Sequence, residues 1–171
     1  TMLRNIPDVT FRETARDFML NQQFRRDYWV RGGRGLSSMQ QLDMLRDEWV
    51  VLNVPREGIK LEASGFRGAA TLNEDVYKPV LDIMADGQSK TLGEIEAALK
   101  PVGKTFNQVV QAALVLIGKG DASPAHPPET IEAVRPKTEA LNNKILSMAP
   151  SGRQVNYLVS PVTGGGMHVN N

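Results

Sequence analysis

Cysteine is absent from the 171 residues of this chain, and histidine occurs only twice. Without cysteine the chain has no disulfide, no thiolate metal ligand and no cysteine nucleophile, and this composition predicts a cytoplasmic protein. His126 and His168 lie among prolines or glycines. A catalytic zinc ion usually needs three clustered protein ligands, so we expect no metal site here.

An excess of one charge and a long apolar run are also missing. The 20 basic and 19 acidic residues give a formal net charge of +1, which provides no broad attraction to nucleic acid or to an anionic membrane. No apolar run approaches the roughly 20 residues that cross a bilayer. The chain begins with Thr1 and ends on Asn170 and Asn171, and we expect it to be a segment excised from a longer protein.

The apolar fraction of 41% and the charged fraction of 23% are typical of a folded protein. The pattern predicts an α+β fold whose first part, residues 1–72, is a mixed α+β unit. We expect a helix capped by Thr10 and Glu13, and a second short helix opened by Ser38 and Gln41. Runs rich in β-branched and aromatic residues predict strands at residues 24–30, 48–54, 59–62 and 66–72.

Residues 73–125 have the pattern of three short helices, which resembles a winged-helix unit. Each helix has a polar start, listed in chain order: Asn73, Thr91 with Glu94, and Thr105 with Gln108. Pro79 predicts that the first helix kinks or begins near Lys78. Gly120 and Gly118 are expected to end the third. Residues 89–91 would form a short strand, and residues 121–125 would pair with 154–160 as the wing.

The third predicted part, residues 126–171, contains a long helix and a C-terminal strand that pack on the rest. The helix spans Pro128 to Met148, with Pro136 expected to bend it. Its apolar stripe from Ile131 to Met148 is a candidate dimer contact, which makes a homodimer one possible assembly.

No motif in the sequence predicts a catalytic, cofactor-binding or metal-ligating residue in this segment. The glycine clusters at residues 32–35 and 164–166 lack the strand-turn-helix context of a cofactor cradle, so we interpret them as structural turns. Gly118-Lys119-Gly120 lacks the remaining residues of a phosphate loop. Carboxylate pairs such as Glu94 and Glu96 are interpreted as solvated helix faces.

The densest unusual run lies between Phe24 and Arg34. If residues 24–30 form a strand, Arg26 lies on one face and Arg25, Trp29 and Arg31 on the other. The simplest interpretation is that arginine stems pack over aromatic rings at a sheet surface. The alternatives are a protein contact through Arg25, Arg26, Trp29 and Arg31, or a nucleic-acid contact.

The run from Asp17 to Arg26, with its motif members Phe18, Asn21, Phe24 and Arg25, is similar to a motif of the bacterial methyltransferase regulatory domain family. Residues 70–73 and 158–166 agree with the same family. The resemblance implies a regulatory region that follows an S-adenosylmethionine-dependent catalytic domain in the same polypeptide, with protein-lysine methyltransferases among its relatives. The residues themselves predict that Asn21 caps a helix, because asparagine tolerates the left-handed conformation.

These observations favour a non-catalytic regulatory or substrate-docking region of a larger methyltransferase. It would act through contacts with the catalytic domain and with a protein substrate, and the S-adenosylmethionine would belong to the parent protein. One alternative is a DNA-binding winged helix, although the third predicted helix carries no cation before Lys119. The others are a small standalone enzyme and a dimerisation domain.

Overall fold

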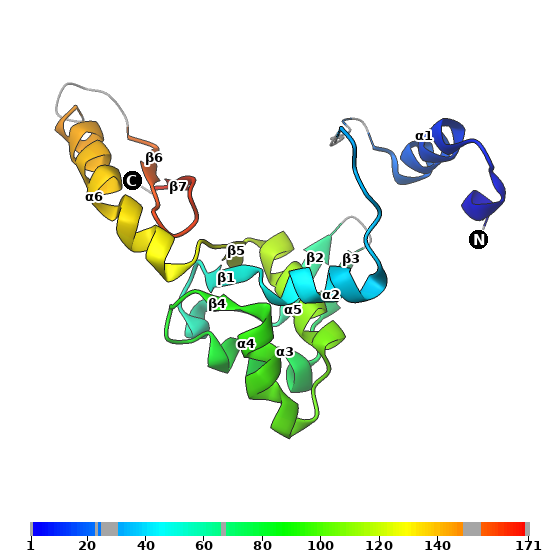
Figure 1. Cartoon of the computed structure of the whole chain (residues 1–171), viewed down its shortest axis with the longest axis horizontal. Helices are drawn as coiled ribbons and strands as arrows, with labels where there is room; N and C mark the ends of the chain where they lie inside the picture. Colours follow the sequence, from blue (N-terminus) through cyan, green and yellow to red (C-terminus); the bar gives the residue numbers. More distant parts are fainter. Residues whose placement is uncertain (1, 23, 25–30, 66–67, 149–154, 170–171) are drawn as a thin grey trace. The chain divides into compact units, whose positions relative to one another are not determined.

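A computed structural model describes residues 2–22, 24, 31–65, 68–148 and 155–169. The chain divides into two compact units, Thr1–Gly35 and Leu36–Asn171 (Figure 1). Helices and small antiparallel sheets occur in one chain, which confirms the predicted α+β class. The predicted bounds 1–72, 73–125 and 126–171 stay a prediction. None of the helices among the described residues combines the length and the apolarity that crossing a bilayer requires.

The first unit consists of a short 3-10 helix, η1 (Met2–Asn5), and the helix α1 (Val9–Leu20). The helix begins earlier than predicted because the Asp8 carboxylate, at 2.6 Å, accepts a hydrogen bond from the backbone N–H of Phe11. A carboxylate at this end also interacts favourably with the helix dipole. The predicted cap at Thr10 is therefore wrong, and Glu13 instead lies 2.9 Å from Arg16.

The second unit contains a three-stranded antiparallel sheet with the strand order β4-β1-β5. Its strands are β1 (Trp49–Leu52), β4 (Lys90–Thr91) and β5 (Ala122–Pro124). The central strand β1 pairs Val50 with Lys90 on one side and with Pro124 on the other. The predictions of strands near 48–54 and 89–91 are confirmed.

The predicted wing is wrong. Strand β5 pairs with β1, whereas β6 (Tyr157–Val159) pairs with β7 (Gly166–His168). The physical reason is burial: Val50 and Val51 of β1 are both buried, so this apolar strand occupies the middle of the sheet. The three helices follow in the predicted order, and the winged-helix resemblance stays a prediction.

The core of this unit lies among α3 (Glu74–Ile83), α4 (Leu92–Leu99) and α5 (Phe106–Lys119). Its largest fully buried side chains come from these helices and the residue after α3: Val80, Leu81, Met84, Ile95, Val109 and Leu116. Burying one such side chain contributes about 1.5–3 kcal/mol to stability. The three helices pack against one another and lie beside the sheet (Figure 1).

The predicted helix ends of this core are confirmed. Asn73 caps α3, Thr91 and Glu94 form a capping box on α4, and Thr105 and Gln108 form one on α5. Gly120 ends α5 with a φ of +85°, in the left-handed region that favours glycine. Helix α3 begins at Glu74 and continues through Pro79, so a start near Lys78 is wrong.

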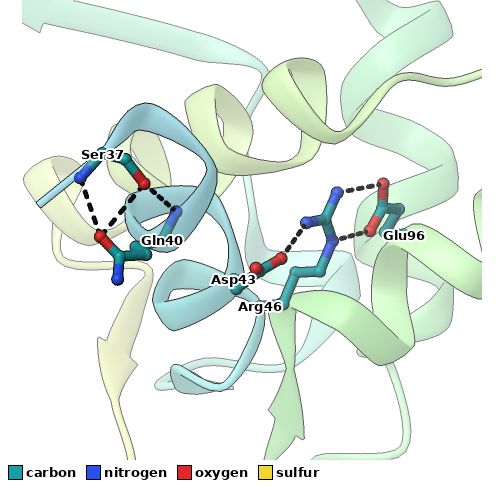
Figure 2. A network of polar contacts seen from close by, with 5 residues as sticks. All are labelled: Ser37, Gln40, Asp43, Arg46 and Glu96. Atoms are coloured by element: carbon teal, nitrogen blue, oxygen red, sulfur yellow. Dashed lines mark hydrogen bonds and ion pairs between the residues drawn. The ribbon is translucent and has the colours of Figure 1, made fainter.

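Helix α2 (Ser38–Arg46) packs Leu42 and Leu45 against this core. Its cap is Ser37 with Gln40, one residue before the predicted pair. Arg46, the last residue of α2, donates hydrogen bonds to both carboxylate oxygens of Glu96 on α4, at 2.7 and 3.3 Å (Figure 2). This fork joins α2 to α4 through two residues that are 50 positions apart in the sequence.

A short 3-10 helix, η2 (Arg56–Gly58), leads to a separate hairpin of β2 (Glu62–Gly65) and β3 (Gly68–Thr71). The predicted strand at 59–62 is wrong in its bounds, because the strand begins at Glu62 while Ile59 is buried in the core. The predicted strand at 66–72 overlaps β3.

The long helix α6 (Pro128–Ser147) confirms the helix predicted over this part. It includes Pro136 and packs against the β6–β7 hairpin. The Asn142 side chain joins them, because its amide nitrogen donates to the Val159 carbonyl at 2.9 Å and its oxygen accepts from the Val159 N–H at 2.8 Å.

Candidate protein-contact surface

The apolar side chains of α1 are exposed. Phe11 and Phe18 are seven residues apart and therefore lie on the same side of the helix, with Ala15 between them. Phe11 is 62% exposed and Phe18 is 84% exposed. In the part of the chain that the structure describes, no residue of α1 is buried. We refer to Phe11, Ala15 and Phe18 as the α1 apolar face.

The C-terminal end of α1 has a well-defined turn. Asn21 adopts a left-handed conformation with a φ of +50°, and this confirms the predicted cap. The N–H of Gln22 donates to the Asp17 carbonyl at 2.9 Å, and the N–H of Asn21 donates to the Phe18 carbonyl at 3.2 Å. These two hydrogen bonds form a Schellman motif, which fixes the direction of the chain after the helix.

Phe18 lies three residues before Asn21 and Phe24 three residues after it, and both rings are exposed. The Gln22 side-chain amide donates to the Phe24 carbonyl. Phe24 is 85% exposed. A hollow of about 180 Å³ at the same end is lined by Thr14, Asp17, Phe18, Asn21 and Gln22. Two predicted motif members, Phe18 and Asn21, therefore line one concave surface.

The charges on α1 are balanced. Glu13 lies 2.9 Å from Arg16 and 3.9 Å from Arg12, and such exposed pairs contribute little to stability. A surface with paired charges and exposed aromatic rings favours recognition by apolar contact over recognition by charge.

The structure tests little of the predicted arginine cluster. Arg25, Arg26 and Trp29 lie outside the described residues, as does most of the predicted strand at 24–30. Arg31 is exposed and occupies a turn with Gly32, whose φ is +68°. The structure thus places only one of the four predicted contact residues.

The residues considered for DNA binding, cofactor or metal binding, and dimerisation form other contacts in the structure. On α5, Gln108 is used in the capping box, and Lys119 lies 2.8 Å from Asp121. Gly164 lies in the turn between β6 and β7, against the ring of His126, and His168 makes an edge contact with Tyr157. Ile131, the first residue of the candidate dimer stripe, is buried within the chain. DNA binding and dimerisation stay predictions.

The sequence analysis did not predict the ionic contact between Arg46 and Glu96. Glu94 is exposed, as expected, and forms the predicted capping box with Thr91. Glu96 was expected on a solvated face, but it is partly buried and accepts hydrogen bonds from Arg46. Arg46 also lies 3.1 Å from Asp43, and its guanidinium lies 4.5 Å from the centre of the Phe106 ring. The Thr91–Glu94 spacing predicts the capping box, whereas no local pattern relates Arg46 to Glu96.

Comparison with known proteins agrees with the first of the sequence resemblances. Residues 1–31 match the family model described as a predicted methyltransferase regulatory domain, so the resemblance is confirmed over these residues. They fall within the first unit, Thr1–Gly35, and include the α1 apolar face. The stretches at 70–73 and 158–166 lie outside the matched residues.

A curated relative covers almost the whole chain. An uncharacterized protein of Synechocystis sp. is 37% identical over 171 residues, which is 99% of this chain and 33% of the relative. The chain thus spans about a third of the length of the curated relative it matches. No solved structure matches the chain.

Proposed function

We propose that this chain is a non-catalytic regulatory or substrate-docking region of a larger S-adenosylmethionine-dependent methyltransferase, and that the α1 apolar face, together with Phe24, docks it on another part of that protein. The observation that carries the proposal is the exposure of Phe18 and Phe24 within the residues that match the regulatory domain. The parent protein would bind the methyl donor and act in the cytoplasm.

The energetics support docking. A phenylalanine side chain buries roughly 150–250 Å² when it is fully enclosed, and such burial contributes about 1.5–3 kcal/mol. Phe11, Phe18 and Phe24 leave most of this free energy unrealised, because each is more than half exposed. A partner surface with an apolar hollow would bury all three rings.

The length of the relative supports a partner in the same polypeptide. About two thirds of the Synechocystis protein lies outside the matched region, because the match covers 33% of it. A docking face on the same chain needs no separate association step, so a modest contact area is sufficient.

The test uses the complete gene product that contains these residues. We expect it to bind S-adenosylmethionine, and we expect the amides of α1 to exchange hydrogen at least about tenfold more slowly there than in the 171-residue chain. The double variant Phe18→Ser/Phe24→Ser should abolish this protection and change the rate of methyl transfer, while leaving the affinity for S-adenosylmethionine unchanged.

The matched control is Met39→Ser/Met44→Ser, which removes two exposed apolar side chains from α2. It should leave both the α1 protection and the methyl-transfer rate unchanged. A complete gene product without a site for S-adenosylmethionine would refute the methyltransferase assignment. Equal α1 exchange rates in the two proteins would refute docking through α1.

A further inference from the structure

A second candidate surface belongs to the unit Leu36–Asn171 and includes none of the residues that match the family. The end of α2, one side of α4, the 3-10 helix η3 (Lys100–Val102) and the start of α5 surround a hollow of about 460 Å³. Its charged lining residues are Arg46, Glu96, Lys100 and Lys104, and Phe106 contributes an aromatic ring. The volume is within the range of small-molecule sites.

The hollow has an excess of positive charge. Three cations line it against one carboxylate, Glu96, and both oxygens of that carboxylate accept hydrogen bonds from Arg46 (Figure 2). The Arg46 hydrogen bond, and then the Arg46 and Lys100 charges, hold the pKa of Glu96 below its ordinary value, so Glu96 is ionised at neutral pH. Asp43, outside the lining, also contacts Arg46.

Lys100 and Lys104 are the cations that remain for a ligand. Among the described residues neither forms an ion pair within 4.0 Å, although the charge of Lys100 acts on Glu96. The two lysines lie on either side of Gly103, whose φ of +72° turns the chain between η3 and α5. The N–H of Lys104 donates to the Leu99 carbonyl at 3.3 Å, so the backbone that carries this lysine is fixed.

The rest of the lining is also held in place. The Arg46 guanidinium lies over the Phe106 ring, which is buried, and this contact limits the freedom of the arginine. Gly93 allows the end of α2 to approach α4, because a Cβ atom there would lie 3.1 Å from the Arg46 carbonyl oxygen. The hollow is therefore bounded by fixed helix ends rather than by a loose surface.

We propose that this hollow binds a small organic phosphate monoester. A phosphate monoester carries about two negative charges at neutral pH, which matches the two lysine cations, Lys100 and Lys104, that form no ion pair among the described residues. Lysine ammonium groups bind phosphate as point charges. The rest of the hollow accepts the organic part. The site is independent of the α1 apolar face and of the proposed function.

The test is a titration of the ¹⁵N-labelled 171-residue chain with ribose 5-phosphate, followed by backbone amide NMR shifts. We expect saturable shifts at Gly93, Gly103 and Lys104, with a Kd below about 10 mM. Ribose without the phosphate should cause no such shifts. The variant Lys100→Gln/Lys104→Gln should weaken binding at least about tenfold, because both free cations are removed.

Lys137→Gln is the matched control, since Lys137 is an exposed lysine on α6 outside this lining. It should bind ribose 5-phosphate as the parent chain does, and the amide spectrum reports whether each variant is folded. Equal affinity in the double lysine variant, equal shifts with plain ribose, or no saturation would overturn the proposal. Tighter binding of a hexaglutamate peptide than of ribose 5-phosphate would also overturn it, in favour of an acidic protein partner.

Discussion

Gly164 shows how one backbone conformation holds the β6–β7 hairpin. Its φ is +69°, and a Cβ atom there would lie 2.4 Å from Nε2 of His126. The backbone N–H of His126 donates to the Val162 carbonyl at 2.8 Å, so residue 126 is joined to the turn through its backbone while its ring lies against Gly164. The glycine is required by both the conformation and the close approach.

We predict that Gly164→Ala lowers the free energy of unfolding by about 1–2 kcal/mol, from the left-handed conformation and the displaced ring. Urea unfolding of the variant and the parent measures this change. Gly165→Ala is the control, because a Cβ atom at Gly165 would meet nothing within 4 Å. Equal losses in the two variants would contradict the role of the His126 contact.

At the scale of elements, the Arg46–Glu96 fork predicts a dependence of stability on pH. The Arg46 hydrogen bond lowers the pKa of Glu96 in the folded protein. A carboxyl group with a depressed folded-state pKa stabilises the fold above its unfolded-state pKa, and this contribution is lost as the pH falls through the folded-state value. The attachment of α2 to α4 should therefore weaken in acid.

We expect Glu96→Gln to be less stable than the parent at pH 7 and to lose less stability between pH 5 and pH 2. Urea unfolding at several pH values tests this. Glu57→Gln, which removes an exposed carboxylate of η2, should keep the parent's pH dependence. The slope of the parent is not due to Glu96 alone, since hydrogen bonds from Lys90 and Gln88 also lower the pKa of Asp86. A parent and a Glu96→Gln variant with the same slope would contradict the prediction.

The elements also show what a sequence can predict. The capping boxes at Thr91 and Thr105 were predictable because each involves residues three positions apart. The partner of β5 was not, because Ala122 pairs with Leu52, far away in the sequence, and the 154–160 segment has an equally suitable alternating pattern. Local spacing cannot choose between two distant strands; burial of Val50 and Val51 does.

At the scale of the whole molecule, the buried side chains and the family match belong to different units. All of the buried residues among those described lie between Val50 and Thr138, within Leu36–Asn171. The matched residues 1–31 lie within Thr1–Gly35. The aromatic motif members of the candidate surface were therefore predictable from the family resemblance. Their exposure was not, because an apolar spacing of 11, 15 and 18 equally suits a buried helix face.

This separation gives the last prediction. All of the buried residues among those described lie within residues 36–171, so deleting residues 1–35 should change the free energy of unfolding by less than about 1 kcal/mol. Urea unfolding of the two chains measures the difference, and the expected result is a single transition at nearly the same midpoint. A loss of more than about 2 kcal/mol would mean that the Phe11 and Phe18 rings are buried against the core of this same chain. In that case α1 would have no free face for another domain, and the docking proposed for it would fail together with this prediction.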